Sequence, residues 1–278
     1  MPATEPPVGT PPHGRAASLA RRMLAGQSRA RITAHNAGAA HHSLAHGLLN
    51  RSTLALAMTA PRRRSPLDAE WREGSEQVRV SLEKSGFTAH ARVTFASCHF
   101  LGDLTWLSPA DAAELERRGT LPATVAVAAR AGAQVALVTL GRLLVHDVNG
   151  VTPLNAKHTD LTAAPAHGIE TDPFLTHELA PTVSEAAART LSHLVRDGAI
   201  DGIRCVSDAP LGLCAPVAQL AAVIDVDATG ITLMTFEDAH VVTTLVPFEH
   251  SAADAGEAAA YLDGLVTRAA SALGSAAR

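Results

Sequence analysis

The segment Gln77-Val-Arg-Val-Ser-Leu-Glu83 alternates polar and apolar side chains, and it is the clearest strand signal in the chain. Its apolar residues Val78, Val80 and Leu82 share one face, because successive side chains of a strand point to opposite sides of a sheet. The pattern therefore predicts a half-buried β-strand whose other face, which carries Arg79, is turned outward.

Further strands are expected on both sides of this segment, most of them joined by short turns rather than by crossover helices. Such connections favour an antiparallel sheet, and an up-and-down or Greek-key barrel is its natural closure. A helix is expected inside this half, because Ser108 can cap its start and Pro109 suits its first position. The expected elements are a helix over 14–28, strands over 29–35, 44–49, 52–59, 77–83, 89–101, 103–107 and 133–146, and a helix over 108–119.

The second half is expected to form a smaller α+β unit. Its expected elements are helices over 173–179 and 184–197, strands over 218–226, 231–236 and 241–247, and a last helix over 251–273. The polar segment 155–172 marks the boundary between the halves. The predicted fold class is therefore α+β. The chain is expected to contain a disordered tail (1–13), an antiparallel barrel domain (14–160) and a small α+β domain (170–278).

Composition limits the class of protein. The chain has 278 residues, a formal net charge of −4 and a pI of about 6.4, which argues against a broad nucleic-acid-binding face. No apolar run of about 18 residues or more occurs, so membrane insertion is not expected. Residues 1–13 lack the basic start and apolar stretch of a secretory signal. The cysteines Cys98, Cys205 and Cys214 stand far apart, which is typical of reduced thiols in a cytoplasmic protein.

Common catalytic motifs are absent from the sequence. It holds no phosphate loop, no dinucleotide fingerprint, no Gly-x-Ser-x-Gly and no His-Glu-x-x-His. The 14 histidines, in contrast, are many for a chain with 18% charged residues. Imidazole ligates iron and zinc well, so a metal or haem site is chemically possible. The four that crowd together match no closed zinc geometry, and we interpret them as parts of a solvated loop: His35, His41, His42 and His46.

Three other histidines have two readings each. His99 falls on an expected strand, on the same face as Phe95, so a buried core histidine is expected and a place in a cofactor pocket is the alternative. His240 and His250 flank the last expected strand. Both are expected to be exposed, either as ordinary loop residues or as groups free to meet a ligand from another subunit.

Arg62, Arg63 and Arg64 form the most concentrated positive charge near the end of an expected strand. Guanidinium groups bind phosphate or carboxylate bidentately, so this run suits a phosphate or a pair of propionates. The alternative is a solvated run of charges.

Two longer stretches resemble a known group of proteins. The first is Ser97-Cys-His-Phe-Leu-Gly-Asp-Leu-Thr-Trp-Leu107, followed by Gly141-Arg-Leu-Leu-Val-His-Asp-Val-Asn-Gly-Val-Thr-Pro153. The second begins with Asp172-Pro-Phe-Leu-Thr-His-Glu178 and includes Ile224-Asp-Val-Asp-Ala-Thr-Gly-Ile-Thr-Leu233. Together they resemble actinobacterial members of the split-barrel group, which are related to pyridoxamine-phosphate oxidase and to HugZ-like haem-utilisation proteins.

The resemblance implies an FMN-binding-like split β-barrel that pairs into a homodimer, with any cofactor in the groove between subunits. It implies a haem-binding protein of iron utilisation, with haem degradation in the manner of a haem oxygenase as a further activity of the group. An FMN-dependent oxidoreductase and a cofactor-free regulatory or interaction protein are the alternatives. For haem, the implied iron ligand is His250 first and His240 second, and Arg62, Arg63 and Arg64 would bind the propionates.

Overall fold

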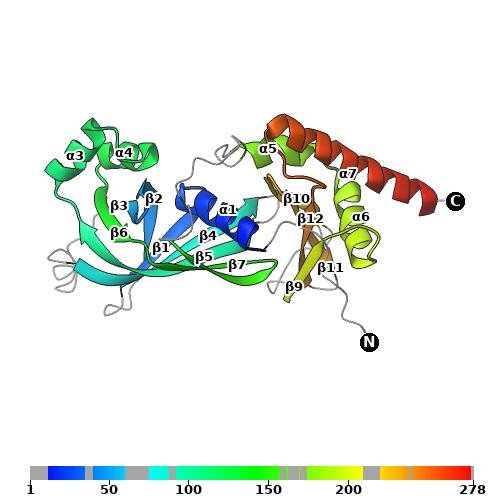
Figure 1. The fold of residues 1–278 in the computed structure, drawn as a ribbon, viewed down its shortest axis with the longest axis horizontal. Coiled ribbons are helices and arrows are strands. Elements are labelled where there is room, and N and C mark those ends of the chain that lie inside the picture. Colours follow the sequence, from blue (N-terminus) through cyan, green and yellow to red (C-terminus); the bar gives the residue numbers. More distant parts are fainter. Residues whose placement is uncertain are drawn as a thin grey trace.

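The computed structural model describes residues 12–34, 40–59, 75–87, 92–156, 161, 169, 174–208, 220–237 and 240–276. Figure 1 shows an elongated molecule with a barrel at one end, a second sheet at the other and helix α1 (Pro12–Leu24) between them. Both sheets are antiparallel, so the α+β class predicted from the sequence is confirmed. Among the described helices, none is long and apolar enough to cross a membrane.

In the part of the chain that the structure describes, six strands form the barrel in the order β4-β1-β2-β3-β6-β5. The barrel is closed because β5 also pairs with β4. All of these pairings are antiparallel, as the short turns of the sequence predict. The strands are β1 (Arg29–Ala34), β2 (Ala40–Asn50), β3 (Thr53–Met58), β4 (Ser75–Phe87), β5 (Arg92–Trp106) and β6 (Gln134–Thr139).

β5 is one continuous strand, not the pair separated at Gly102 that the sequence suggested. Its second half pairs with β6, and its first half pairs with β7 (Arg142–Asp147), which continues into β8 (Gly150–Asn155). Gly102 lies where β5 changes partner, and a Cβ there would come within 2.2 Å of the Thr139 carbonyl oxygen. The glycine therefore permits a close backbone approach rather than ending the strand.

The expected single strand over 133–146 is instead two strands, β6 and β7, that turn at Leu140 and Gly141. Gly150 and Pro153 belong to β8, which lies beyond the end of the expected strand. Gly150 supplies a positive φ of 101° in the β7–β8 turn. Pro153 is tolerated because β8 lies at the edge of the sheet, where no neighbour needs its missing N–H.

Two helices, α3 (Pro109–Arg117) and α4 (Ala123–Arg130), cover one side of the barrel. Ser108 caps α3, since its side chain accepts a hydrogen bond from the Asp111 backbone N–H, as the sequence predicted. α4 was missing from the sequence prediction. It packs Val125 and Ala126 against apolar side chains of β3 and β6.

The second sheet has the order β10-β11-β12-β9. Helices α5, α6 and α7 cover one of its faces (Figure 1), and the other face turns toward the barrel. Ile231 and Leu233 of β11 pack with the helices, while Met234 joins the core of the barrel. The elements are α5 (Leu175–Leu179), a 3-10 turn (Ala180–Thr182), α6 (Glu185–Arg196), β9 (Ile203–Asp208), β10 (Ala221–Asp227), β11 (Gly230–Glu237), β12 (His240–Pro247) and α7 (Ala255–Ala276).

Candidate functional site on the outer face of the barrel

Side chains of alternate residues on β4, β5, β7 and β8 point away from the core and form one exposed surface, called the outer face below. On the inner side of β4, Val78, Val80 and Leu82 are fully buried, as the alternation in the sequence predicted. The opposite positions carry the side chains of interest. They are Arg79, Ser81 and Glu83 on β4, Ser97, His99 and Leu101 on β5, Arg142, Leu144 and His146 on β7, and Val151 and Pro153 on β8.

The strand register places these residues in rows across the sheet. His99 lies between Ser81 of β4 and Leu144 of β7. Ser97 lies in the next row, opposite His146. Leu101 lies in the row on the other side and is opposite Arg79.

His99 is held in place by its neighbours. Its Nδ1 lies 3.0 Å from the Ser81 hydroxyl and its Nε2 lies 3.1 Å from the Ser97 hydroxyl. A hydroxyl can donate or accept, so the two serines satisfy a neutral imidazole in either tautomer. Partial burial, followed by the nearby charges of Arg79 and His146, lowers the pKa of His99. The ring is therefore neutral near pH 7.

His146 meets His99 edge-on. The ring centroids are 5.2 Å apart and the planes are inclined by 77°. Both nitrogens of His99 have serine partners, whereas His146 is exposed and has no hydrogen bond among the contacts of the described residues. His146 is thus the imidazole that can accept a ligand on this face.

An apolar strip borders the two histidines. Leu101 and Val151 are each 58% exposed, and Leu144 is 37% exposed. Single exposed leucines are common, but three such side chains beside a histidine pair on one face indicate a binding surface.

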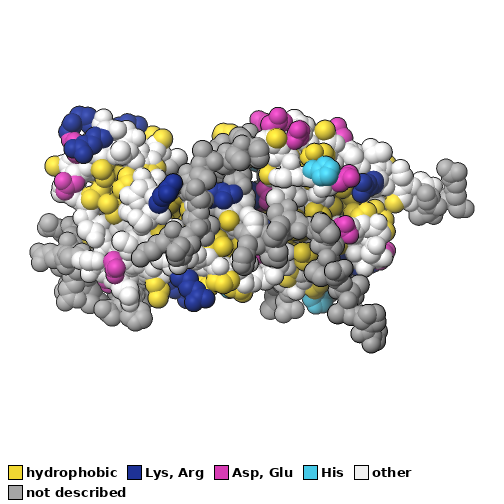
Figure 2. Space-filling model, viewed as in Figure 1, with side chains coloured by type: hydrophobic (Ala, Val, Ile, Leu, Met, Phe, Trp, Pro, Cys, Tyr) yellow, Lys and Arg dark blue, Asp and Glu magenta, His cyan; other side chains and the backbone are white. Residues whose placement is uncertain are grey.

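Arginines line the same face. Arg79 and Arg142 are exposed. Arg29 and Arg31 of β1 are exposed too, and they lie opposite Glu83 and Ser81 of β4. None of these four forms an ion pair within the described part of the chain. In Figure 2, most basic side chains in view lie over the barrel, while acidic ones gather over the helices of the second sheet. On the side of the molecule shown in Figure 2, positive side chains are thus more frequent over the barrel than over the second sheet.

The histidine cluster at 35–46 is not a solvated loop where it is described. His41 and His42 lie in β2, and His35 falls outside the described residues. His46 is 3% exposed, and its Nε2 contacts the Met23 carbonyl at 2.8 Å and the Ser28 hydroxyl at 3.2 Å. Burial lowers the pKa of His46, although the hydrogen bond to Met23 opposes the shift. His46 is therefore a structural contact between β2 and α1.

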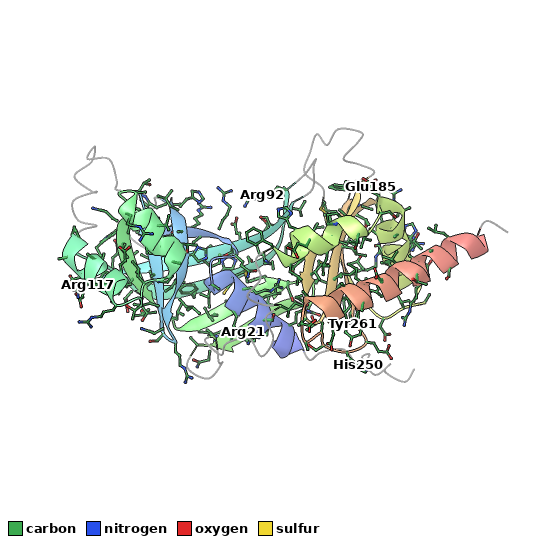
Figure 3. All side chains as sticks on the ribbon, turned by 90° about the horizontal axis from the view of Figure 1, so that it is seen from above. Arg21, Arg92, Arg117, Glu185, His250 and Tyr261 are labelled. Carbon is green, nitrogen blue, oxygen red and sulfur yellow. The ribbon has the colours of Figure 1, made fainter. Side chains whose placement is uncertain are left out.

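The residues implied by the family resemblance lie elsewhere. His240 begins β12 and is paired with Asp208 of β9, whereas His250 is exposed just beyond the end of that strand. At about 3.3 Å per residue along β12, their Cα atoms are more than about 20 Å apart, so they cannot share one ligand. Figure 3 shows His250 near Tyr261 of α7, far from Arg117 of the barrel. Arg62, Arg63 and Arg64 lie outside the described residues.

The prediction that His99 is a core residue was wrong. Phe95 and Ala96 are both buried, because a β-bulge opposite Lys84 and Ser85 inserts one residue into β5. The bulge reverses the alternation, so His99 does not share the face of Phe95. On the inner side, burial raises the pKa of the Cys98 thiol to about 12, which excludes it as a nucleophile near pH 7.

Apart from the arginines of the outer face, a set of buried charged side chains lies between α1, the barrel and the second sheet. We call it the junction cluster. The Nη atoms of Arg22 donate to both carboxylate oxygens of Asp225 at 2.9 Å. Arg15 donates to Asp227 at 2.9 Å and lies 3.5 Å from Asp147, and Lys84 lies 3.7 Å from Asp225.

The junction cluster is arranged for structure. Although burial alone would disfavour its charge, Arg22 and Lys84 hold the pKa of Asp225 below its usual value. The positive and negative groups balance, so the cluster leaves no charge for a ligand. Within the described residues, no three histidine, cysteine or acidic side chains are placed to hold a metal ion.

Comparison with known proteins finds only distant similarities to solved structures. No family model and no curated protein matches it. A heme binding protein from Mycobacterium smegmatis is 15% identical with a TM-score of 0.42, over 97% of this chain and 100% of that one. A protein of unknown function from Agrobacterium tumefaciens is 15% identical with a TM-score of 0.32, over 95% and 100%. A flavocytochrome from Azotobacter vinelandii is 15% identical with a TM-score of 0.30, over 52% and 72%. The barrel architecture itself rests on the strand pairing of this chain.

Proposed function

We propose that this protein binds haem on the outer face of its barrel, with His146 as the iron ligand. The observation that supports the proposal best is the edge-on pair of His99 and His146 beside an exposed apolar strip. The resemblance of the sequence to haem-utilisation proteins points to the same small molecule, haem.

The donor set of the outer face fits haem in three respects. Haem needs an imidazole or similar ligand for its iron, an apolar surface for its ring and cations for its propionates. His146, the strip around Leu144 and Val151, and the exposed arginines provide these groups. Haem, when bound, supplies iron-centred redox and oxygen chemistry, and the protein residues bind and orient it.

His99 has a supporting role in this proposal. The hydroxyls of Ser81 and Ser97 fix its ring, and the fixed ring limits the positions that His146 can adopt. Its neutral state also avoids a like charge next to an iron ligand. Degradation of the bound haem is the further activity that the family resemblance implies.

The proposal includes pairing of two copies. The apolar strip would be covered in part by a second copy, which would place the haem in a groove between two barrels. His250 and His240 are the second choice of ligand, because a loop of a neighbouring subunit can reach an outer face that its own chain does not approach. The division into a tail (1–13), a barrel domain (14–160) and a small domain (170–278) also remains a proposal. Residues 1–11 of the tail lie outside the described residues, and α1 begins at Pro12.

A hemin titration followed by absorbance tests this function. We expect a shifted Soret band with the wild-type protein. His146→Ala should weaken hemin binding by about 10-fold or more and move the band, since the iron loses its protein ligand. His250→Ala and His240→Ala are the matched controls and should leave both quantities unchanged.

Other outcomes would identify the alternatives. A band that moves with His250→Ala or His240→Ala, and not with His146→Ala, would restore the ligands implied by the resemblance. A flavin spectrum in the purified protein would indicate the FMN-dependent oxidoreductase. Absence of both would favour the regulatory protein.

A further inference from the structure

Two arginines on the outer face flank Leu101 on neighbouring strands. Arg79 of β4 is directly opposite Leu101. Arg142 of β7 precedes Leu143, which is opposite Phe100, and Gly141 lies against the Leu101 carbonyl. In the strand register, Leu101 therefore lies between Arg79 on one neighbouring strand and Arg142 on the other.

Arg79 and Arg142 also lie close to His99 along their strands. Arg79 is two residues from Ser81, and Arg142 is two residues from Leu144, the two residues between which His99 lies. With strands about 4.8 Å apart, the Cα atoms of the two arginines are about 10 Å apart, one row along the strands from His99. A flat ring seated over the histidines would thus present one edge to both guanidinium groups.

Neither arginine forms an ion pair with another described residue. Glu83 and Asp103 are the carboxylates of this face nearest to them, and neither forms an ion pair with Arg79 or Arg142 among the described residues. Within the junction cluster, in contrast, Arg15 and Arg22 both pair with buried aspartates. Arg79 and Arg142 are exposed, have no acidic partner among the described residues and lie on either side of an apolar side chain. This arrangement matches a ligand that is apolar in its body and carries two anionic groups at one edge.

We propose that Arg79 and Arg142 form a carboxylate clamp that selects porphyrins with two free propionates. The inference rests on the proposed binding of haem, and it specifies the class of ligand. Recognition comes from the carboxylates and the ring rather than from the iron, so the metal-free dicarboxylic porphyrin also binds. Guanidinium groups suit this role because they bind carboxylates bidentately.

Fluorescence titration with metal-free protoporphyrin IX and with its dimethyl ester tests the clamp without any iron ligand. The ester keeps the ring and removes both negative charges. We expect the wild-type protein to prefer the free acid by about 10-fold or more, as expected for charge-assisted hydrogen bonds. Arg79→Gln with Arg142→Gln should remove this preference and leave the affinity for the ester unchanged.

A control with the same change in charge is available on the second unit. Arg189 and Arg268 are exposed on α6 and α7, away from the barrel, and Arg189→Gln with Arg268→Gln removes two positive charges. This control should retain the full preference for the free acid. An equal loss in both double variants would replace the clamp by a general effect of net charge.

The clamp and the haem-binding function can fail separately. If the wild-type protein binds hemin with a Soret shift but takes the free acid and the ester equally well, the clamp is refuted and haem binding stands. If it binds neither hemin nor protoporphyrin IX, both are refuted. Partial recovery of the preference by Arg79→Lys with Arg142→Lys would support a clamp in which charge and bidentate geometry both contribute.

Discussion

The junction cluster and the outer face use similar residues in opposite ways. In the junction cluster, Arg15 and Arg22 are almost fully buried, and each donates to an aspartate of the second sheet. On the outer face, Arg79 and Arg142 are exposed beside apolar side chains and have no acidic partner in the described structure. The contrast indicates that charge fully paired inside the molecule stabilises the fold, whereas unpaired charge beside an exposed apolar strip is available to a ligand.

The largest effect is expected from breaking the junction cluster. Asp225→Asn removes the bidentate partner of Arg22 and leaves that guanidinium buried without its counter-charge. The free energy of unfolding should fall by about 3–5 kcal/mol, which urea denaturation can measure. Glu116→Gln, at the exposed pair with Arg130, is the control and should cost less than about 1 kcal/mol. Equal effects of the two substitutions would mean that burial of the ion pair is unimportant.

A smaller effect concerns the buried histidine that joins β2 to α1. Burial holds the pKa of His46 in the folded protein below that of the unfolded chain, so the unfolded chain binds more protons between the two values. The free energy of unfolding should therefore decrease as the pH falls below about 6.5. His46→Gln should flatten this dependence, because the amide can donate to the Met23 carbonyl without titrating.

The control for His46 is His42→Gln, at an exposed position of the same strand. It should leave the slope of stability against pH unchanged. A slope that His46→Gln does not alter would show that another group causes the acid sensitivity.

The smallest effect on stability is expected on the outer face. Arg79→Gln, Arg142→Gln and His146→Ala each change an exposed side chain, so the free energy of unfolding should shift by less than about 0.5 kcal/mol. Urea denaturation without ligand checks this expectation. A loss above about 2 kcal/mol would assign the face to the stability of the fold and contradict the comparison.

The sequence predicted much of the barrel because its strands follow local rules. The alternation at Val78, Val80 and Leu82 predicted β4 and its inner face, and Ser108 with Pro109 predicted the start of α3. These signals depend only on neighbours in the chain. They are the reason that the antiparallel, α+β character was predicted correctly.

The site was harder to predict because it depends on pairing. The bulge near Phe95 decides on which face His99 lies, and it exists only because β4 is its partner. His146 was placed in a strand that was too long. Gly141 and the Asn149–Gly150 pair were the signals that could have divided that strand into a hairpin.

The junction cluster also lies beyond sequence reasoning. Arg22 and Asp225 are separated by 203 positions in the chain, and an arginine on a short helix is normally expected at the surface. Their pairing follows from the packing of the second sheet against α1. No local pattern in either segment predicts it.

The most direct test measures how much hemin stabilises three proteins against urea: the wild type, Asp225→Asn and His146→Ala. A ligand at about 100 times its Kd adds about 2.7 kcal/mol to the free energy of unfolding. We predict that Asp225→Asn starts far less stable and gains the same increment as the wild type. His146→Ala should start as stable as the wild type and gain much less. A full gain by His146→Ala, or no gain by the wild type, would contradict the assignment of haem to the outer face.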